Sequence, residues 1–94
     1  MGINQTLKAL ADPVRRNILE MLKQGPKSAG EIAQAFELTP ATVSYHLSQL
    51  KKAGLLLEEK KKNFIYYSLD ITVFEEILVW FQSLEGGGNE NEKK

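Results

Sequence analysis

The residues from Thr39 to Gln49 have types and spacing suited to hydrogen bonding with a nucleic acid. Within the segment Leu38–Gly54, apolar residues recur at i, i+4 and i+7, a stripe that must face a core if the segment is helical. The stripe consists of Val43, Leu47 and Leu50. The other face carries short donors, acceptors and methyl groups, on Thr39, Pro40, Ala41, Thr42, Ser44, Tyr45, His46, Ser48 and Gln49. These groups suit base edges and phosphates in a major groove, although an ordinary amphipathic surface helix has the same pattern.

Most other chemistries lack their residues in this chain. There is no cysteine, which excludes disulfides, thiol sensing and thiolate metal sites, and His46 is the single histidine. The sequence offers neither a nucleophile with a credible base nor a glycine loop that could cradle a phosphate. We therefore expect no enzymatic activity, no cofactor and no metal site. Two roles stay open for His46: contact with a base or phosphate, and structural hydrogen bonding.

Charges of opposite sign are segregated along the 94 residues, although the formal net charge is zero. Residues 1–69 hold ten Lys/Arg and six Asp/Glu (+4), whereas residues 70–94 hold two Lys and six Asp/Glu (−4). The basic part contains the predicted helix within Leu38–Gly54, which we call the recognition helix. This charge distribution permits DNA binding, but proteins that bind no nucleic acid often share it. The sequence shows no membrane-spanning stretch and no export signal, so we expect a cytoplasmic protein.

Three predicted helices precede and position the recognition helix. The first covers Ile3–Ala11, and the second follows the Asp12-Pro13 cap and runs to Lys23. The third opens with a capping box between Ser28 and Glu31. Only Glu37 and Leu38 separate it from Thr39, which is a good N-cap before Pro40, so the two helices meet as a helix-turn-helix.

Arg15 and Arg16 lie near the start of the second helix. They could anchor a DNA phosphate. They could equally belong to a solvated face or form structural ion pairs with Glu20.

A predicted hairpin follows the recognition helix. The runs LLLEEK and FIYYSL have strand character, and Lys61–Asn63 can form the turn because Asn63 tolerates a positive φ. The tip carries Lys60, Lys61, Lys62 and Asn63. Lysines also protect a sheet edge from aggregation, but directly after a helix-turn-helix we interpret this hairpin as a wing that contacts phosphate or the minor groove.

The last predicted helix begins at Asp70 or at Thr72, since Thr72 and Glu75 match a capping box, and runs to Leu84. Its apolar residues form two stripes, too many for one core, so we expect a homodimer built from the first and last helices. The predicted interface residues are Ile3, Leu7, Val73, Ile77, Trp80, Phe81 and Leu84. Residues 1–85 would form one domain, and residues 86–94 a disordered tail.

The order of these elements resembles the winged-helix repressors of the ArsR/SmtB family over residues 5–84. The resemblance rests on the segments Leu10–Leu22, Ser28–Leu56 and Phe64–Leu69. The short chain and the FIYYSL wing look like the SdpR-type autorepressor branch. Family members often sense metals through cysteines near the third helix or through histidines and carboxylates on the last helix, and neither set is present here. The chain also departs from the family at the turn, where Glu37 replaces a frequent glycine, and at the wing tip, which lacks the usual glycine.

These observations predict a mainly α domain with a small β-hairpin, a winged helix-turn-helix of order ααααββα. The homodimer would place two recognition helices in successive major grooves of a pseudo-palindromic operator in double-stranded DNA. It would act as a transcriptional repressor of its own gene and would not sense metals. A protein antagonist is a candidate further partner.

Two alternative functions stay open. One is a winged-helix protein-interaction module without DNA binding, which the zero net charge favours. The other is a repressor that also binds an organic ligand at the dimer interface near Trp80 and Phe81, although a place in the core is the simpler role for these aromatics.

Overall fold

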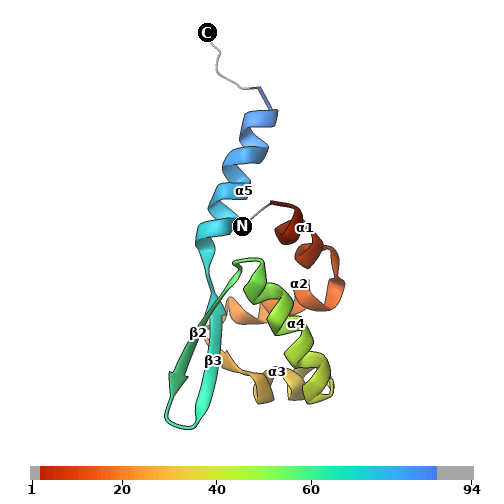
Figure 1. The fold of residues 1–94 in the computed structure, drawn as a ribbon, viewed down its shortest axis with the longest axis vertical. Coiled ribbons are helices and arrows are strands. Elements are labelled where there is room, and N and C mark those ends of the chain that lie inside the picture. Colours follow the sequence, from red (N-terminus) through yellow and green to blue (C-terminus); the bar gives the residue numbers. More distant parts are fainter. Residues whose placement is uncertain (1–2, 87–94) are drawn as a thin grey trace.

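The structure is a computed structural model that describes residues 3–86. In chain order its elements are α1 (Ile3–Ala11), α2 (Pro13–Leu22), β1 (Lys27–Ser28), α3 (Ala29–Phe36), α4 (Pro40–Lys52), β2 (Leu56–Lys61), β3 (Phe64–Leu69) and α5 (Ile71–Leu84) (Figure 1). The fold is the predicted winged helix-turn-helix, with one short strand, β1, added before α3. Apart from Gly86, the predicted tail lies outside the described residues.

Side-chain caps fix the starts of the helices that the sequence predicted. The Asp12 carboxylate accepts hydrogen bonds from the backbone N–H groups of Val14 (2.8 Å) and Arg15 (3.1 Å), directly before Pro13 begins α2. Ser28 and Glu31 form the reciprocal capping box of α3. These bonds satisfy N–H groups that have no partner inside the helix.

Two more caps bound the recognition helix and the last helix. Thr39 accepts from the backbone N–H of Thr42 (3.2 Å), so α4 starts where the sequence indicated. Of the two candidates for α5, Asp70 is the N-cap and accepts from Thr72 (3.1 Å). The predicted capping box at Thr72 is wrong, because Thr72 already lies inside the helix.

The turn between α3 and α4 depends on Glu37, which adopts a left-handed conformation with φ 55° and ψ 44°. This conformation lets the backbone N–H of Leu38 donate to the Ala33 carbonyl (3.0 Å) and ends α3 abruptly. The glutamate therefore occupies the backbone conformation that glycine adopts more readily.

The sheet is antiparallel with strand order β1-β3-β2. In the wing hairpin Lys61 pairs with Phe64, and Lys62 and Asn63 form the turn. The positive φ expected at Asn63 occurs instead at Lys62 (57°), so that expectation is wrong. β1 was not predicted, because two residues are too short to show a periodic pattern.

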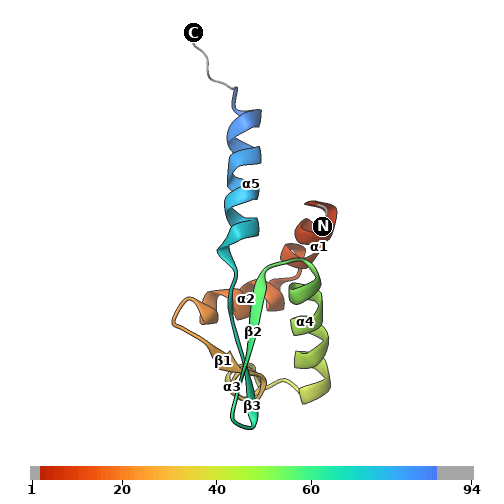
Figure 2. The same ribbon diagram turned by 60° about the vertical axis from the view of Figure 1, so that its left-hand side comes forward.

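The core lies between α1–α4 and the inner face of the sheet. Its most deeply buried apolar residues are Ile18, Ile32, Val43, Leu50 and Leu55. The Thr6 hydroxyl donates to the Ala53 carbonyl (3.2 Å) and joins α1 to the end of α4. Only the first turns of α5 reach this core, and Figures 1 and 2 show that the rest of α5 extends away from the other helices.

Candidate nucleic-acid interface

The recognition helix α4 has one buried and one exposed face, as the sequence predicted. Its apolar stripe of Val43, Leu47 and Leu50 is buried. The exposed candidate contact residues are Thr39, Pro40, Ala41, Ser44 and Tyr45, together with Ser48, while Thr42 and Gln49 are half-buried. Tyr45 is the largest of these side chains and is 57% exposed. The exposed face therefore presents hydroxyl and ring groups without a formal charge.

His46 does not belong to that face, and its predicted exposed position is wrong. Its side chain is buried, with 7% exposure, and Nδ1 lies 3.4 Å from Arg15 Nη1. His46 lies three residues after Val43 and four before Leu50, so it continues the buried stripe at 3-4 spacing. That spacing was the signal that could have placed it inside.

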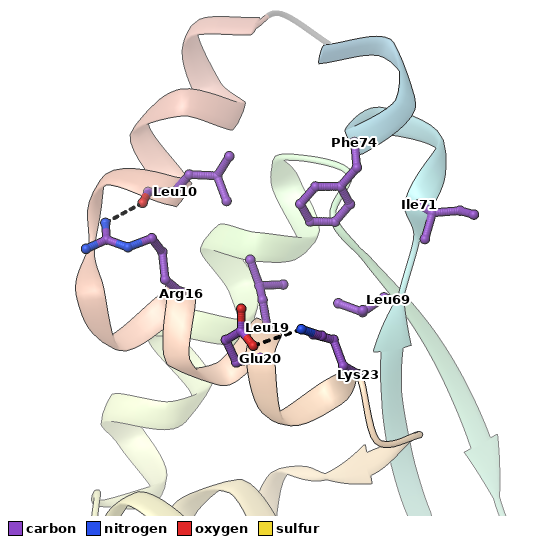
Figure 3. A pocket seen from close by; sticks show the side chains of 8 residues that line it. All are labelled: Leu10, Arg16, Leu19, Glu20, Lys23, Leu69, Ile71 and Phe74. Atoms are coloured by element: carbon purple, nitrogen blue, oxygen red, sulfur yellow. Dashed lines mark hydrogen bonds and ion pairs between the residues drawn. The ribbon is translucent and has the colours of Figure 1, made fainter. Parts of the chain in front are cut away.

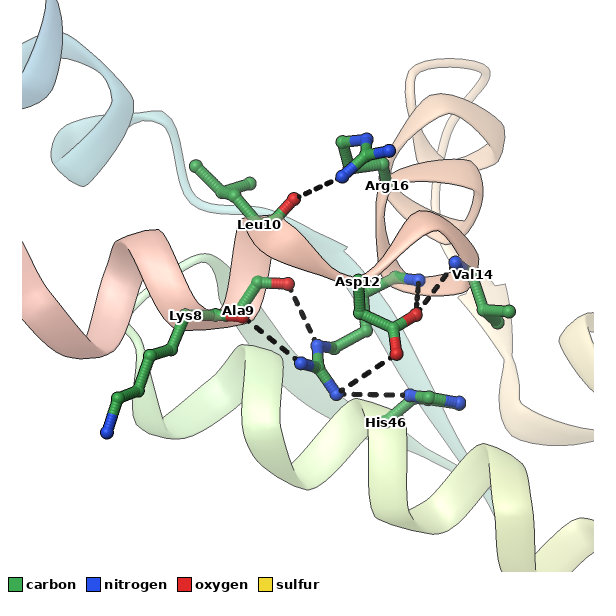
Figure 4. Close-up of polar contacts among 8 residues, drawn as sticks. Lys8, Ala9, Leu10, Asp12, Val14, Arg16 and His46 are labelled. Atoms are coloured by element: carbon green, nitrogen blue, oxygen red, sulfur yellow. Dashed lines mark hydrogen bonds and ion pairs between the residues drawn. The ribbon is translucent and has the colours of Figure 1, made fainter.

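Arg15 is used within the fold. Its Nε donates to the Ala9 carbonyl (2.8 Å), its Nη2 donates to the Lys8 carbonyl (3.2 Å), and its Nη1 lies 3.9 Å from Asp12 Oδ2 (Figure 4). The side chain is only 11% exposed. Arg15 thus closes the carbonyl end of α1, and the phosphate contact considered for it is not available in this arrangement.

Arg16 is exposed and stays a candidate phosphate anchor. Its Nη1 donates to the Leu10 carbonyl (2.8 Å), which leaves other donors of the guanidinium open to solvent. The ion pair considered with Glu20 is wrong, because Glu20 pairs with Lys23 (3.1 Å).

The corner between α1 and α2, where Asp12 caps α2, lowers the pKa of the Asp12 carboxyl group. The hydrogen bond from the Arg15 backbone N–H is the largest cause, and the Val14 N–H and the nearby positive charge of Arg15 act in the same direction against the effect of burial. Asp12 therefore stays ionised in the folded protein at neutral pH.

The wing tip carries four exposed residues, Lys60, Lys61, Lys62 and Asn63. Phe64 beside them is 59% exposed, and its ring lies 6.4 Å from that of Tyr66 on the same face of the hairpin. The tip therefore offers positive charge to a phosphate and an apolar ring next to it.

An ion pair between Lys51 and Glu58 connects α4 to the wing. Its hydrogen bond raises the pKa of Lys51. Burial raises the pKa of Tyr67, and the Glu58 charge adds to that effect. A polar hollow of about 230 Å³ lies at this junction, lined by Ser44, Leu47, Ser48, Lys51, Glu58 and Tyr67.

A second cavity, of about 370 Å³, lies beside the first turn of α5, which we call the foot of α5 (Figure 3). Its apolar lining comes from Leu10, Leu19, Leu69, Ile71 and Phe74, and its charged lining from Arg16, Glu20 and Lys23. Trp80 and Phe81, which suggested a ligand from the sequence, do not line it.

The outer half of α5 exposes apolar side chains. Of the predicted interface residues, Trp80, Phe81 and Leu84 are 42%, 51% and 65% exposed. Ile3 and Leu7 of α1 are also exposed, and Ile77 is half-buried. Val73 was wrongly assigned to this surface, because it is 6% exposed and belongs to the core of its own chain. Ile71, Leu78 and Val79 are exposed apolar residues of α5 that the predicted interface did not include.

Comparison with known proteins identifies this arrangement. A model described as a helix-turn-helix domain matches residues 10–59. Over 93% of its length the chain is 39% identical to the transcriptional repressor SdpR of Bacillus subtilis, of which it covers 97%. The chain belongs to the ArsR/SmtB family. It is also 38% identical to an arsenic resistance transcriptional regulator of Pseudomonas putida, over 66% of the chain and 49% of that protein.

Solved structures of ArsR/SmtB-family proteins share the fold. An ArsR family transcriptional regulator superposes with a TM-score of 0.80 at 25% identity, covering 88% of this chain and 86% of that one. The winged helix-turn-helix DNA-binding domain Mb0332 of Mycobacterium bovis, described as homodimeric, gives 0.73 at 26% identity and covers 98% and 85%.

The predicted class of function is confirmed by this membership. The protein is a DNA-binding transcriptional regulator of the ArsR/SmtB family. Within residues 3–86, no helix is long and apolar enough to cross a membrane.

Proposed function

We propose that this ArsR/SmtB-family protein binds a pseudo-palindromic operator as a homodimer, in the cytoplasm, and represses its own gene. The observation that carries the proposal is the apolar surface of α5. Trp80, Phe81 and Leu84 continue the core-facing stripe of Ile77 beyond the end of the core, and 42%, 51% and 65% of their surfaces stay exposed. A symmetric partner would bury them and join two copies of the DNA-binding unit.

Dimerisation gives the DNA contacts their spacing. Two recognition helices related by a two-fold axis reach successive major grooves about 34 Å apart. Thr39, Pro40, Ala41, Thr42, Ser44, Tyr45 and Gln49 would contact bases or phosphates from each α4. Lys60–Asn63 of each wing and Arg16 would contact the backbone outside that groove.

We also propose that control does not pass through a metal ion. The only histidine is buried in α4, the chain has no cysteine, and the described residues bring no three His, Asp or Glu side chains together. A transition-metal site requires several such ligands. Control would then depend on protein level, on an antagonist protein, or on an organic ligand, for which the cavity at the foot of α5 is the candidate place.

Fluorescence anisotropy with a fragment of the protein's own promoter tests these proposals. We expect binding that is tighter than to a scrambled fragment and that weakens steeply with salt, because Lys and Arg contacts release counterions from DNA. Equal affinity for both fragments would contradict operator recognition. Zinc, cadmium and arsenite should leave the affinity unchanged, and a tenfold change that a chelator reverses would contradict the absence of metal control.

A further inference from the structure

His46 connects the recognition helix to the corner between α1 and α2. It lies on α4 between two exposed candidate contact residues, Tyr45 and Ser48, but its own ring is buried. The ring meets the Arg15 guanidinium, with Nδ1 of His46 3.4 Å from Nη1 of Arg15. His46 can therefore influence DNA binding without touching DNA.

Arg15 is held firmly in this contact. Its guanidinium donates to two carbonyls at the end of α1 and faces Asp12, so it has little freedom to follow a moving ring. Arginine also keeps its proton in proteins, and all of its polar atoms are donors. A hydrogen bond across this 3.4 Å contact requires Nδ1 of His46 to be the acceptor, and therefore a neutral ring with its proton on Nε2.

A proton on Nδ1 would turn this attraction into a repulsion. The groups that face the ring are Arg15 from α2, Asp12 from the cap of α2, and the ring of Tyr45, whose centroid lies 5.5 Å away. Asp12 is the only anion among these groups, and its Oδ1 already accepts two backbone N–H groups. Its other oxygen, Oδ2, lies 3.9 Å from Arg15 Nη1, so this carboxylate already faces the guanidinium that a protonated ring would repel.

We propose that the Arg15–His46 contact positions the recognition helix, so that operator binding requires a neutral His46 and weakens as the pH falls. His46 is a positioning residue here, and its protonation would displace the α4 backbone that carries Ser44 and Tyr45. The inference rests on the proposed function, because it takes α4 as the helix that contacts the operator.

The single histidine makes a direct test feasible in the wild-type protein. NMR would follow the His46 ring and the amide signals of residues 44–48 from pH 8 to 5.5, without DNA. Anisotropy would follow operator affinity over the same range at fixed ionic strength. We expect one midpoint for all three signals and a loss of affinity of about tenfold, the size of one hydrogen bond to a charged group.

Two variants separate positioning from other causes. His46→Asn keeps an acceptor near the place of Nδ1 but does not titrate, so it should bind almost as tightly as wild type at pH 8 and lose its pH dependence. His46→Leu fills the volume without an acceptor, and should bind more weakly at every pH.

The inference would be overturned by wild-type affinity that does not change with pH, by a His46→Asn profile that falls like that of wild type, or by α4 amide signals that stay fixed while the His46 ring signal changes. Affinity that rises on acidification would also overturn it, since that sign indicates a cationic ring on a phosphate. Absence of operator binding at pH 8 would contradict the proposed function instead, and the α4 amide signals would still decide whether His46 positions the helix.

Discussion

Lys51, in the last turn of the recognition helix, forms an ion pair with Glu58 on the inner face of the wing. The pair joins the two elements that would contact DNA. Both side chains are accessible, with 57% and 30% of their surface exposed. A DNA phosphate that approaches the hollow beside Ser44 and Ser48 would therefore compete with Glu58 for the same ammonium group.

Replacing Glu58 by glutamine should strengthen DNA binding. The change removes an anion that repels phosphate and frees Lys51 for a contact with the backbone. We expect several-fold tighter operator binding and a plot of log affinity against log salt that is steeper by about one unit, since one more phosphate is neutralised. Anisotropy titrations at several salt concentrations would measure both.

Glu59→Gln is the matched control for this prediction. It removes the same charge from the next residue, which points to the opposite face of β2 and has no partner on α4. Equal effects of Glu58→Gln and Glu59→Gln would mean that only net charge matters, and would contradict a specific role for the ion pair.

The exposed face of α4 should carry operator specificity. Ser44→Ala removes an exposed hydroxyl outside the buried stripe, and Tyr45→Ala removes an exposed ring that also lies against the buried His46 ring. Each lost direct base contact should weaken operator binding by about 1 to 3 kcal/mol and leave binding to random DNA nearly unchanged. Gel-shift titrations with both DNAs would measure this, with the exposed Gln34→Ala on α3 as control. Unchanged operator affinity in both variants would remove these side chains from the contact surface.

The sequence predicted the helices and the wing because their signals are local. Caps such as Thr39 before Pro40 act within one turn, and the α3 capping box spans four residues. The strand β1 could not be seen, because Lys27 and Ser28 become a strand only by pairing with Tyr67 and Tyr66, about 40 residues away.

The sequence predicted the candidate site less well than the fold. Hydrogen bonds to residues distant in sequence decide which polar side chains remain available to DNA. Arg15 looked like a surface cation until α1 placed two carbonyls against it. His46 looked like a contact residue because it lies outside the stripe of Val43, Leu47 and Leu50. Its true neighbour, Arg15, lies 31 positions away, and no local pattern connects the two.

The exposed end of α5 should control dimerisation. Leu84 is 65% exposed and does not belong to the core of its own chain, so Leu84→Glu should leave the chain folded but place a charge in the proposed interface. Sedimentation velocity at micromolar concentration should show a dimer for wild type and a monomer for Leu84→Glu, with weaker operator binding after loss of the second half-site. Gln82→Glu adds a charge at another exposed position of α5 and should stay dimeric. A monomeric wild type would contradict the proposed dimer.

Asp12 should make folding stability depend on pH in the acidic range. Its pKa in the folded protein is lower than the ordinary value of 3.8, chiefly because the Arg15 N–H donates to the carboxylate. A group with a lowered pKa in the folded state stabilises the fold fully above its unfolded-state pKa and loses that contribution as the pH falls through the folded-state value.

Asp12→Asn retains an N-cap oxygen but does not titrate, whereas Asp12→Ala loses the cap and should cost about 1 kcal/mol at neutral pH. Urea unfolding between pH 7 and 3 should therefore show the advantage of wild type over Asp12→Asn shrinking below about pH 4, while other carboxylates titrate equally in both proteins. A difference between these two proteins that stays constant to pH 3 would show that the Asp12 charge does not contribute to the stability of the α1–α2 corner.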